Sequence, residues 1–192
     1  VLAVVLGMQV GLGRMDRQLY DFAQSLRKRP VPAEVVIVTI DDESVAALGR
    51  WPWRRAVLAT LLHHIAAAKP RAVGLDVILS EPDVRDPQGD AVLARVMQTV
   101  PGLVLPVVAV ARGGPNPQPL LPIPQFLDAG VRLAHTHVEP DEDGVVRSIF
   151  LQEGTAREQW PAFSLAVGGD ALPFANRPGD RRPPGETAQG AW

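Results

Sequence analysis

The sequence predicts an α/β fold: a single domain with a mainly parallel central sheet flanked by helices, plus an antiparallel hairpin, preceded by an N-terminal stalk helix. Three observations predict it. Apolar runs of strand length at 35–40 and 72–79 enclose a segment with helical spacing, and such a unit places its two strands in parallel. A third apolar run covers 103–110, after another helical segment. The letters "DEDG" at 141–144 then predict a tight turn between two extended segments.

The composition limits the classes of function. The chain has 192 residues, of which 46% are apolar and 21% charged, as is typical of globular proteins. The formal net charge is −2 and the arginines are scattered, which argues against a nucleic-acid partner, since such a partner needs a clustered basic face. There is no cysteine, so disulfides, cysteine nucleophiles and thiolate metal sites are excluded.

The N-terminal residues 1–13 are almost all apolar, but they are fewer than the about 20 that a membrane-spanning helix needs. They form either a buried first element or, as we favour, the outer half of a transmembrane helix. Leu19, Phe22 and Leu26 follow at helical spacing among charged residues, which suits a stalk helix leaving a membrane.

These patterns divide the chain into three parts. We assign the end of a transmembrane helix and the stalk to 1–29, and the α/β domain to 30–169. From 170 to 192, proline, glycine and arginine recur without periodicity, which predicts a disordered tail or linker.

The elements of the domain can be predicted in order from its start. "VVIVTI" at 35–40 is apolar on both faces, as a buried central strand is. A short helix follows, with Asp42 or Ser44 as its N-cap and Gly49 as its stop. A longer helix begins near Arg54 and ends before the Lys-Pro pair that precedes the second strand, which is again predicted to be buried.

The second half of the domain alternates in the same way. A helix is predicted over 90–99, and the strand at 103–110 contains Pro106, which lacks a backbone donor and so predicts an edge strand or a bulge. Segments 131–139 and 145–153 are predicted to pair as the antiparallel hairpin. "WPAFSLAVGG" then predicts a short amphipathic helix that ends at a double glycine.

Acidic residues gather where parallel sheets usually bind ligands. Asp41, Asp42 and Glu43 follow the first predicted strand, while Asp76 lies in the second strand and Glu81 just after it. Because ligands bind at the carboxyl ends of parallel strands, neighbouring strands would bring these side chains to one rim. There they suit a divalent cation, an amine or sugar ligand, or base catalysis. The alternative is that Asp42 caps a helix, Asp76 satisfies loop amides and the others are solvated.

Asp76 is the most informative of these residues, because a carboxylate inside a buried strand is costly unless it is paired. Arg50 or Arg54 is the expected partner. Between these arginines, Trp51 and Trp53 flank a proline in a stiff turn. Indole rings on such a turn suit the stacking of a ring or sugar, or a cation held against a π face. The alternative is that the tryptophans plug the end of the sheet.

We therefore predict one side of a ligand pocket here, for a cationic or hydroxyl-rich ligand rather than an anionic one. The predicted ligand-binding residues are Asp41, Asp42, Glu43, Arg50, Trp51, Trp53, Arg54, Asp76 and Glu81.

Signatures of enzymes and metal sites are weak. His135 and His137 alternate on a predicted strand and share a face, but no third metal ligand is in view. "DEDG" lacks the distal glutamate of a calcium loop, and "IDDES" has a glutamate where dehalogenase-type phosphatases have their second aspartate. No phosphate-binding glycine loop and no nucleophile elbow occurs. We predict no catalytic residue, no metal ion and no cofactor.

Residues 35–83 resemble the second type of CHASE domain, an extracytoplasmic sensory domain of bacterial receptors. The matching motifs are Asp-Asp-x-Ser after the first strand, the Gly-x-Trp-Pro-Trp turn, "LDVILSEPD" and the later "PDEDGVVR". The combination is specific, and the resemblance covers about residues 16–165. It departs at the Arg54-Arg55 pair, where the family often has Pro-Arg, and at Ile78, where phenylalanine is usual.

The resemblance implies a place and a role. Such domains face the periplasm between transmembrane helices and control a cytoplasmic histidine kinase of a two-component system, a serine/threonine kinase, or an adenylyl or diguanylate cyclase. The domain itself would not be an enzyme. It would bind an undefined small-molecule ligand, and we expect the receptor to be a homodimer that contacts the membrane through its flanking helices.

Two other functions stay open at this point. One is a metal-dependent hydrolase that uses Asp41, Glu43 and Asp76. The other is a structural module that mediates dimerisation and binds nothing.

Overall fold

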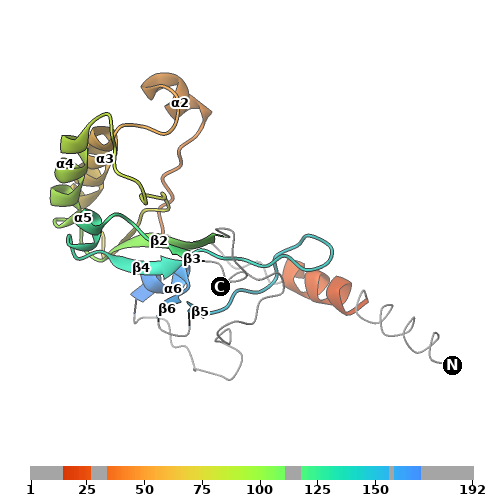
Figure 1. Ribbon diagram of the computed structural model, residues 1–192. Coiled ribbons are helices and arrows are strands. Elements are labelled where there is room, and N and C mark those ends of the chain that lie inside the picture. Colours follow the sequence, from red (N-terminus) through yellow and green to blue (C-terminus); the bar gives the residue numbers. More distant parts are fainter. Residues whose placement is uncertain (1–14, 27–33, 111–117, 156–157, 170–192) are drawn as a thin grey trace. The chain divides into compact units, whose positions relative to one another are not determined.

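The computed structural model describes residues 15–26, 34–110, 118–155 and 158–169 (Figure 1). The chain divides into two compact units, Val1–Ala47 and Leu48–Trp192. The apolar run before residue 15 and the predicted tail after 169 lie outside the described residues, so the predictions for both stay predictions. None of the described helices is both long enough and apolar enough to cross a membrane.

The first unit contains a helix over residues 15–26, where the sequence predicts the stalk. Its apolar side chains are exposed: Leu19, Phe22 and Leu26 are 66%, 61% and 70% accessible. These residues lie in a helix, but the stalk helix predicted for this part of the chain stays a prediction.

The predicted first strand at 35–40 is not formed. These residues belong to no strand, and Val36 and Ile37 are 81% and 79% exposed. β-branched residues favour extended backbone, but a strand also needs a hydrogen-bonded neighbour, and the described residues provide none. The prediction of a buried central strand, and of its parallel pairing with 72–79, was therefore wrong.

A short helix, α2 (Asp42–Leu48), follows where it is predicted. Its cap is neither of the two residues proposed from the sequence. The carboxylate of Asp41 accepts hydrogen bonds from the Ser44 backbone N–H at 2.9 Å and the Ser44 hydroxyl at 2.6 Å. The helix stops at Gly49, whose φ of 93° is readily adopted by glycine, as predicted.

The second unit is built around a mainly parallel sheet, which confirms the predicted fold class. Its long middle strand, β2 (Leu103–Val110), pairs in parallel with β1 (Val73–Gly74) and β4 (Arg132–His135), and antiparallel with β3 (Gln118–Leu120). The antiparallel β2–β3 pair supplies the hairpin, although not with the residues predicted for it.

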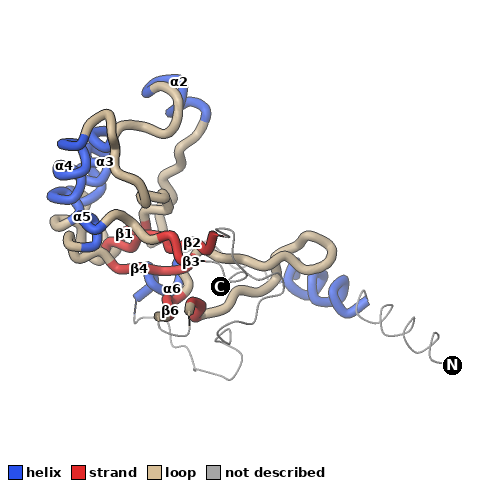
Figure 2. The backbone as a smooth tube through the Cα atoms, viewed as in Figure 1, coloured by secondary structure: helices blue, strands red, loops and turns tan. Residues whose placement is uncertain are grey.

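Helices cover both faces of this sheet (Figures 1 and 2). Successive residues of β2 point to opposite faces, so Leu103 and Leu105 pack in one apolar cluster and Val104 in another. The first cluster includes Leu58 of α3 (Arg55–Ala67) and Leu93 of α4 (Pro87–Met97). A short helix, α5 (Pro124–Leu127), adds Phe126 to it. The second cluster contains α6 (Phe163–Gly168), the predicted C-terminal helix.

The approach of α6 to the sheet explains a glycine in β1. A Cβ atom at Gly74 would lie 2.7 Å from both Phe163 and Val167 of α6. A side chain there would force Phe163 and Val167 to move, so glycine allows α6 to pack closely on β1.

Pro106 lies in the middle strand and in continuous register with β4, so neither of the two predicted alternatives, an edge strand or a bulge, is found. The Leu75 N–H donates to the Val104 carbonyl, so Val104 faces β1, and Pro106, two residues on, faces the same side. At that point β1 has ended and the pairing with β3 begins only at Val108. The missing N–H of proline therefore breaks no ladder hydrogen bond.

The predicted hairpin of 131–139 with 145–153 is only partly formed. Its turn is present, because the Gly144 N–H donates to the Asp141 carbonyl at 2.8 Å. Its strands have other partners: β4 pairs with β2, and β5 (Gln152–Gly154) pairs antiparallel with β6 (Gln159–Pro161) in a small second sheet. The alternation in the sequence identified extended segments but did not identify their neighbours.

Candidate functional site

The second unit contains a pocket of about 320 Å³ at the start of α3. Three segments build it: the turn before α3, α3 itself and the stretch after β1. Its lining residues are Trp51, Pro52, Trp53, Arg55, Leu58, Asp76, Val77 and Ile78. Three of the nine residues predicted to bind ligand, namely Trp51, Trp53 and Asp76, thus line one cavity.

The two tryptophans have different roles. Trp53 is buried, at 9% exposure, and its indole N–H donates to the Gly49 carbonyl at 2.7 Å. Trp51 is 37% exposed and meets Trp53 edge to face, with ring centroids 5.5 Å apart and planes at 70°. Trp53 therefore anchors the turn, while Trp51 offers aromatic surface to the cavity.

Asp76 does not have the arginine partner predicted for it. Beyond β1 the chain alternates, with Leu75, Val77 and Leu79 buried, and Asp76 and Ile78 exposed. The prediction assumed a strand buried on both faces, where a carboxylate must be paired. Because the alternation turns Asp76 outward, the cost of burial does not arise, and no ion pair to it is found in the described part of the chain.

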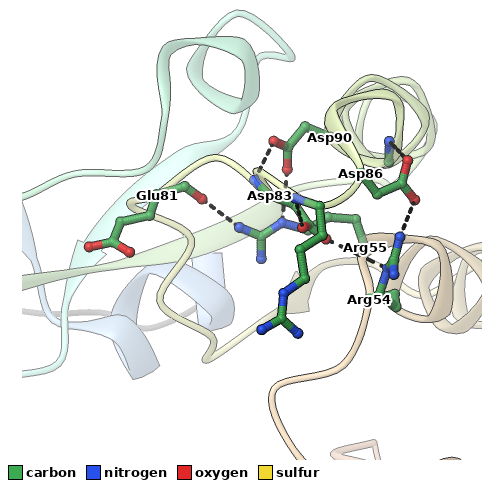
Figure 3. Close-up of polar contacts among 8 residues, drawn as sticks. Arg54, Arg55, Glu81, Asp83, Asp86 and Asp90 are labelled. Carbon is green, nitrogen blue, oxygen red and sulfur yellow. Dashed lines mark hydrogen bonds and ion pairs between the residues drawn. The ribbon is translucent and has the colours of Figure 1, made fainter.

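The arginines are paired instead with acids that precede and begin α4 (Figure 3). Arg55 Nε donates to Asp90 Oδ1 at 2.8 Å, and its guanidinium also donates to the Glu81 carbonyl at 2.6 Å. Arg54 lies 3.4 Å from Asp86 and 3.9 Å from Asp83. These contacts hold the loop 81–86 against the start of α3.

Asp90 is the centre of this arginine–acid network. It is 2% exposed, and its second oxygen accepts from the Asp83 N–H at 2.9 Å. The guanidinium of Arg55 also lies 5.8 Å from the centroid of the Phe126 ring. Arg55 therefore contacts the loop 81–86, α4 and the apolar core. Sequence reasoning missed Arg55 and Asp90. The signal was the paired arginines at a helix start together with the acid-rich "PDVRDPQGD", which contains their partners.

The remaining residues of the predicted pocket do not line the cavity. Glu81 contributes its backbone carbonyl to Arg55, while its carboxylate points away from the arginines in Figure 3. Arg50 is exposed. Asp42 and Glu43 are exposed in the first turn of α2, in the first unit of the chain.

Asp41 is engaged as the cap of α2. The two hydrogen bonds from Ser44, first from its hydroxyl and then from its backbone N–H, favour the ionised carboxylate. They hold the pKa of Asp41 below its usual value. This is the capping role that the alternative interpretation of the acid cluster proposes, though for a different aspartate.

His135 and His137 share a face, as predicted, and both lie at Glu153. His137 Nδ1 is 2.9 Å from Glu153 Oε1, and His135 Nδ1 is 3.7 Å from the other carboxylate oxygen. Glu153 and His135 are buried. Even so, no group of three or more histidine, cysteine or acidic residues in the described ranges is arranged to hold a metal ion.

The acids of "DEDG" are engaged with an arginine. Arg147 donates to Asp141 at 2.6 Å and to Asp143 at 2.8 Å, and Asp143 also accepts from the Val145 N–H. Arg147 thus bridges both aspartates and holds them in the turn. The prediction of a turn at this place is confirmed.

A family model described as the CHASE2 domain matches residues 1–188. The chain belongs to the CHASE2 family. CHASE2 domains are extracytoplasmic, non-catalytic sensory domains of signalling proteins, so sensing is the general role of this domain too. No curated protein and no solved structure matches the chain. The arrangement of this CHASE2 domain must therefore be interpreted from its own residues.

Proposed function

We propose that this CHASE2 domain is the extracytoplasmic ligand-binding module of a bacterial transmembrane receptor that controls a cytoplasmic kinase or nucleotide cyclase. The family membership supports sensing, and the pocket supports a bound small molecule. One observation carries the proposal: an aromatic surface, an apolar wall and the Asp76 carboxylate, which has no ion-pair partner among the described residues, line the same cavity.

The proposed ligand-binding residues are those predicted from the sequence, with Trp51, Trp53 and Asp76 at their centre. The other six, Asp41, Asp42, Glu43, Arg50, Arg54 and Glu81, stay predictions. The rival hydrolase has no support in the described part of the chain, where no acid or histidine group is arranged for a metal ion.

A thermal-shift screen of small metabolites on the whole chain tests this function. A ligand that binds only the folded state must stabilise it, by about 2.7 kcal/mol at a concentration of 100 Kd. We expect hits that raise the Tm of the wild-type chain and of Val84→Ala, an exposed site outside the pocket, but not that of Trp51→Ala. A broad screen without any such hit would contradict ligand binding and favour the alternative, a structural module that mediates dimerisation.

We also propose that the receptor is a homodimer joined through the helix at 15–26. Its exposed apolar residues Met15, Leu19, Phe22 and Leu26 recur at steps of four, three and four. This is the a/d spacing of a coiled-coil seam, and a second copy of the helix presents the matching stripe.

The oligomeric state in solution tests the dimer. Leu19→Asp places a charge in the proposed seam and should convert a dimer to a monomer in light scattering after size exclusion. Gln24→Asp adds the same charge away from the seam and should leave the dimer intact. A Leu19→Asp chain that still runs as a dimer contradicts this proposal but not the ligand pocket.

A further inference from the structure

The pocket has a simple polar composition, which narrows the chemistry of its ligand. Of its four polar side chains, two are engaged with the protein: Trp53 donates to Gly49, and Arg55 donates to Asp90 and to the Glu81 carbonyl. Trp51 brings an indole ring with one donor. Asp76 brings a carboxylate for which the described part of the chain contains no hydrogen-bond or ion-pair partner.

The charges in the pocket do not cancel. The positive charge of Arg55 is matched by Asp90, which is buried beside it at 2.8 Å. Asp76 therefore adds one uncompensated negative charge to the wall of the cavity. An anionic ligand would be repelled there, whereas a cation supplies the missing counter-charge.

The aromatic surface favours the same class of ligand. Indole is the ring that binds cations best through its π face, and the edge-to-face pair of Trp51 and Trp53 presents such a surface next to the carboxylate. Leu58, Val77 and Ile78 complete an apolar wall. Six of the eight lining residues are aromatic or aliphatic, so few groups in this pocket could hydrogen-bond the several hydroxyl groups of a sugar.

We infer that the pocket binds a small organic cation, an ammonium group that carries apolar substituents. Its charge would lie at Asp76, and its substituents would contact the indole rings and the aliphatic wall. At about 320 Å³ the cavity lies at the lower end of the range for ligand sites, which suits a metabolite and not a peptide. This inference rests on the proposed sensory function and specifies the ligand of the same pocket.

Calorimetry with matched pairs of compounds on the whole chain tests the inference. Choline and phenethylamine are the cations, and 3,3-dimethylbutan-1-ol and 2-phenylethanol are neutral compounds of nearly the same shape. We expect at least one cation to bind at least tenfold more tightly than its neutral partner. Asp76→Asn should weaken that cation at least tenfold, Asp76→Glu should retain part of the affinity, and Asp128→Asn, an exposed acid outside the pocket, should change nothing.

The outcomes separate the ligand class from the function. Equal binding of cation and neutral partner, an unchanged affinity in Asp76→Asn, or no binding by either cation overturns the inference. If the thermal-shift screen then yields neutral or anionic hits that Trp51→Ala abolishes, the pocket is still a sensory site and only the cationic class is wrong. If that screen yields nothing at all, the inference and the proposed function both fall.

Discussion

Asp90 and Asp76 lie near the same arginine-rich turn, yet their surroundings are opposite. Asp90 is 2% exposed, bound to Arg55 and to a backbone N–H, and built into the packing of α3 against α4. Asp76 is exposed at the wall of a cavity, and no ion pair to it is found among the described residues. The paired carboxylate holds α3 against α4, whereas Asp76, which has no ion-pair partner among the described residues, is the one that we propose binds the ligand.

The largest effect should come from breaking the paired side. Asp90→Ala leaves the mostly buried guanidinium of Arg55 without its counter-ion, and removal of one partner from a buried pair costs about 3–5 kcal/mol. Urea denaturation of the two chains measures this. If the free energy of unfolding falls by less than about 1 kcal/mol, Asp90 does not have the structural role that distinguishes it from Asp76.

The two tryptophans give the next largest contrast. Trp53→Ala removes a buried ring and the hydrogen bond to Gly49, so the free energy of unfolding should fall by about 3 kcal/mol. Trp51→Ala, at a half-exposed site, should cost less than about 1.5 kcal/mol while abolishing ligand binding. Equal losses of stability would show that both rings serve mainly to pack the end of the sheet.

The cap of α2 should give a smaller, local effect that depends on pH. Asp41→Ala removes the acceptor of both Ser44 hydrogen bonds, so residues 42–48 should lose helix content in backbone chemical shifts. Because the pKa of Asp41 is lowered in the folded chain, its contribution is present above about pH 4 and is lost as the pH falls through that lowered pKa. A wild-type α2 that frays equally at pH 7 and at pH 2 would contradict the capping role.

The smallest effect on stability should come from Asp76→Asn. Asp76 is exposed and no ion pair to it is found in the described ranges, so its substitution should change the free energy of unfolding by no more than about 0.5 kcal/mol. Urea denaturation should therefore barely distinguish this variant from the wild type. A loss of more than about 2 kcal/mol would instead place Asp76 among the structural residues, with Asp90.

The sequence predicted the parts of this molecule that depend on local pattern. Helical spacing located α3, and the apolar run of β2 located the centre of the sheet. The mainly parallel sheet followed from the order of strands and helices. The tryptophan turn and Asp76 were predicted to share a pocket, and they line one cavity.

What failed depends on partners far along the chain. The runs 35–40 and 72–79 are equally apolar, yet only the second has a neighbouring strand, because pairing is decided by which backbone groups meet. Arg55 and Asp90 are 35 residues apart, and no local pattern selects Arg55 over Arg50 as the arginine that binds a carboxylate. The partner of Asp76 was also mispredicted. Burial of 72–79 on both faces was assumed from the residue types alone.

The most direct test follows the indole N–H signals of the chain by NMR during a titration with the cation that binds best in calorimetry. Trp51 and Trp53 should both shift, while Trp160, buried in a separate apolar cluster with Val107, should stay in place. In Asp76→Asn the same shifts should need at least tenfold more cation. Shifts at Trp160 as large as those at Trp51, or an unchanged titration midpoint in Asp76→Asn, would contradict the proposal that this pocket is the sensory site for a cation.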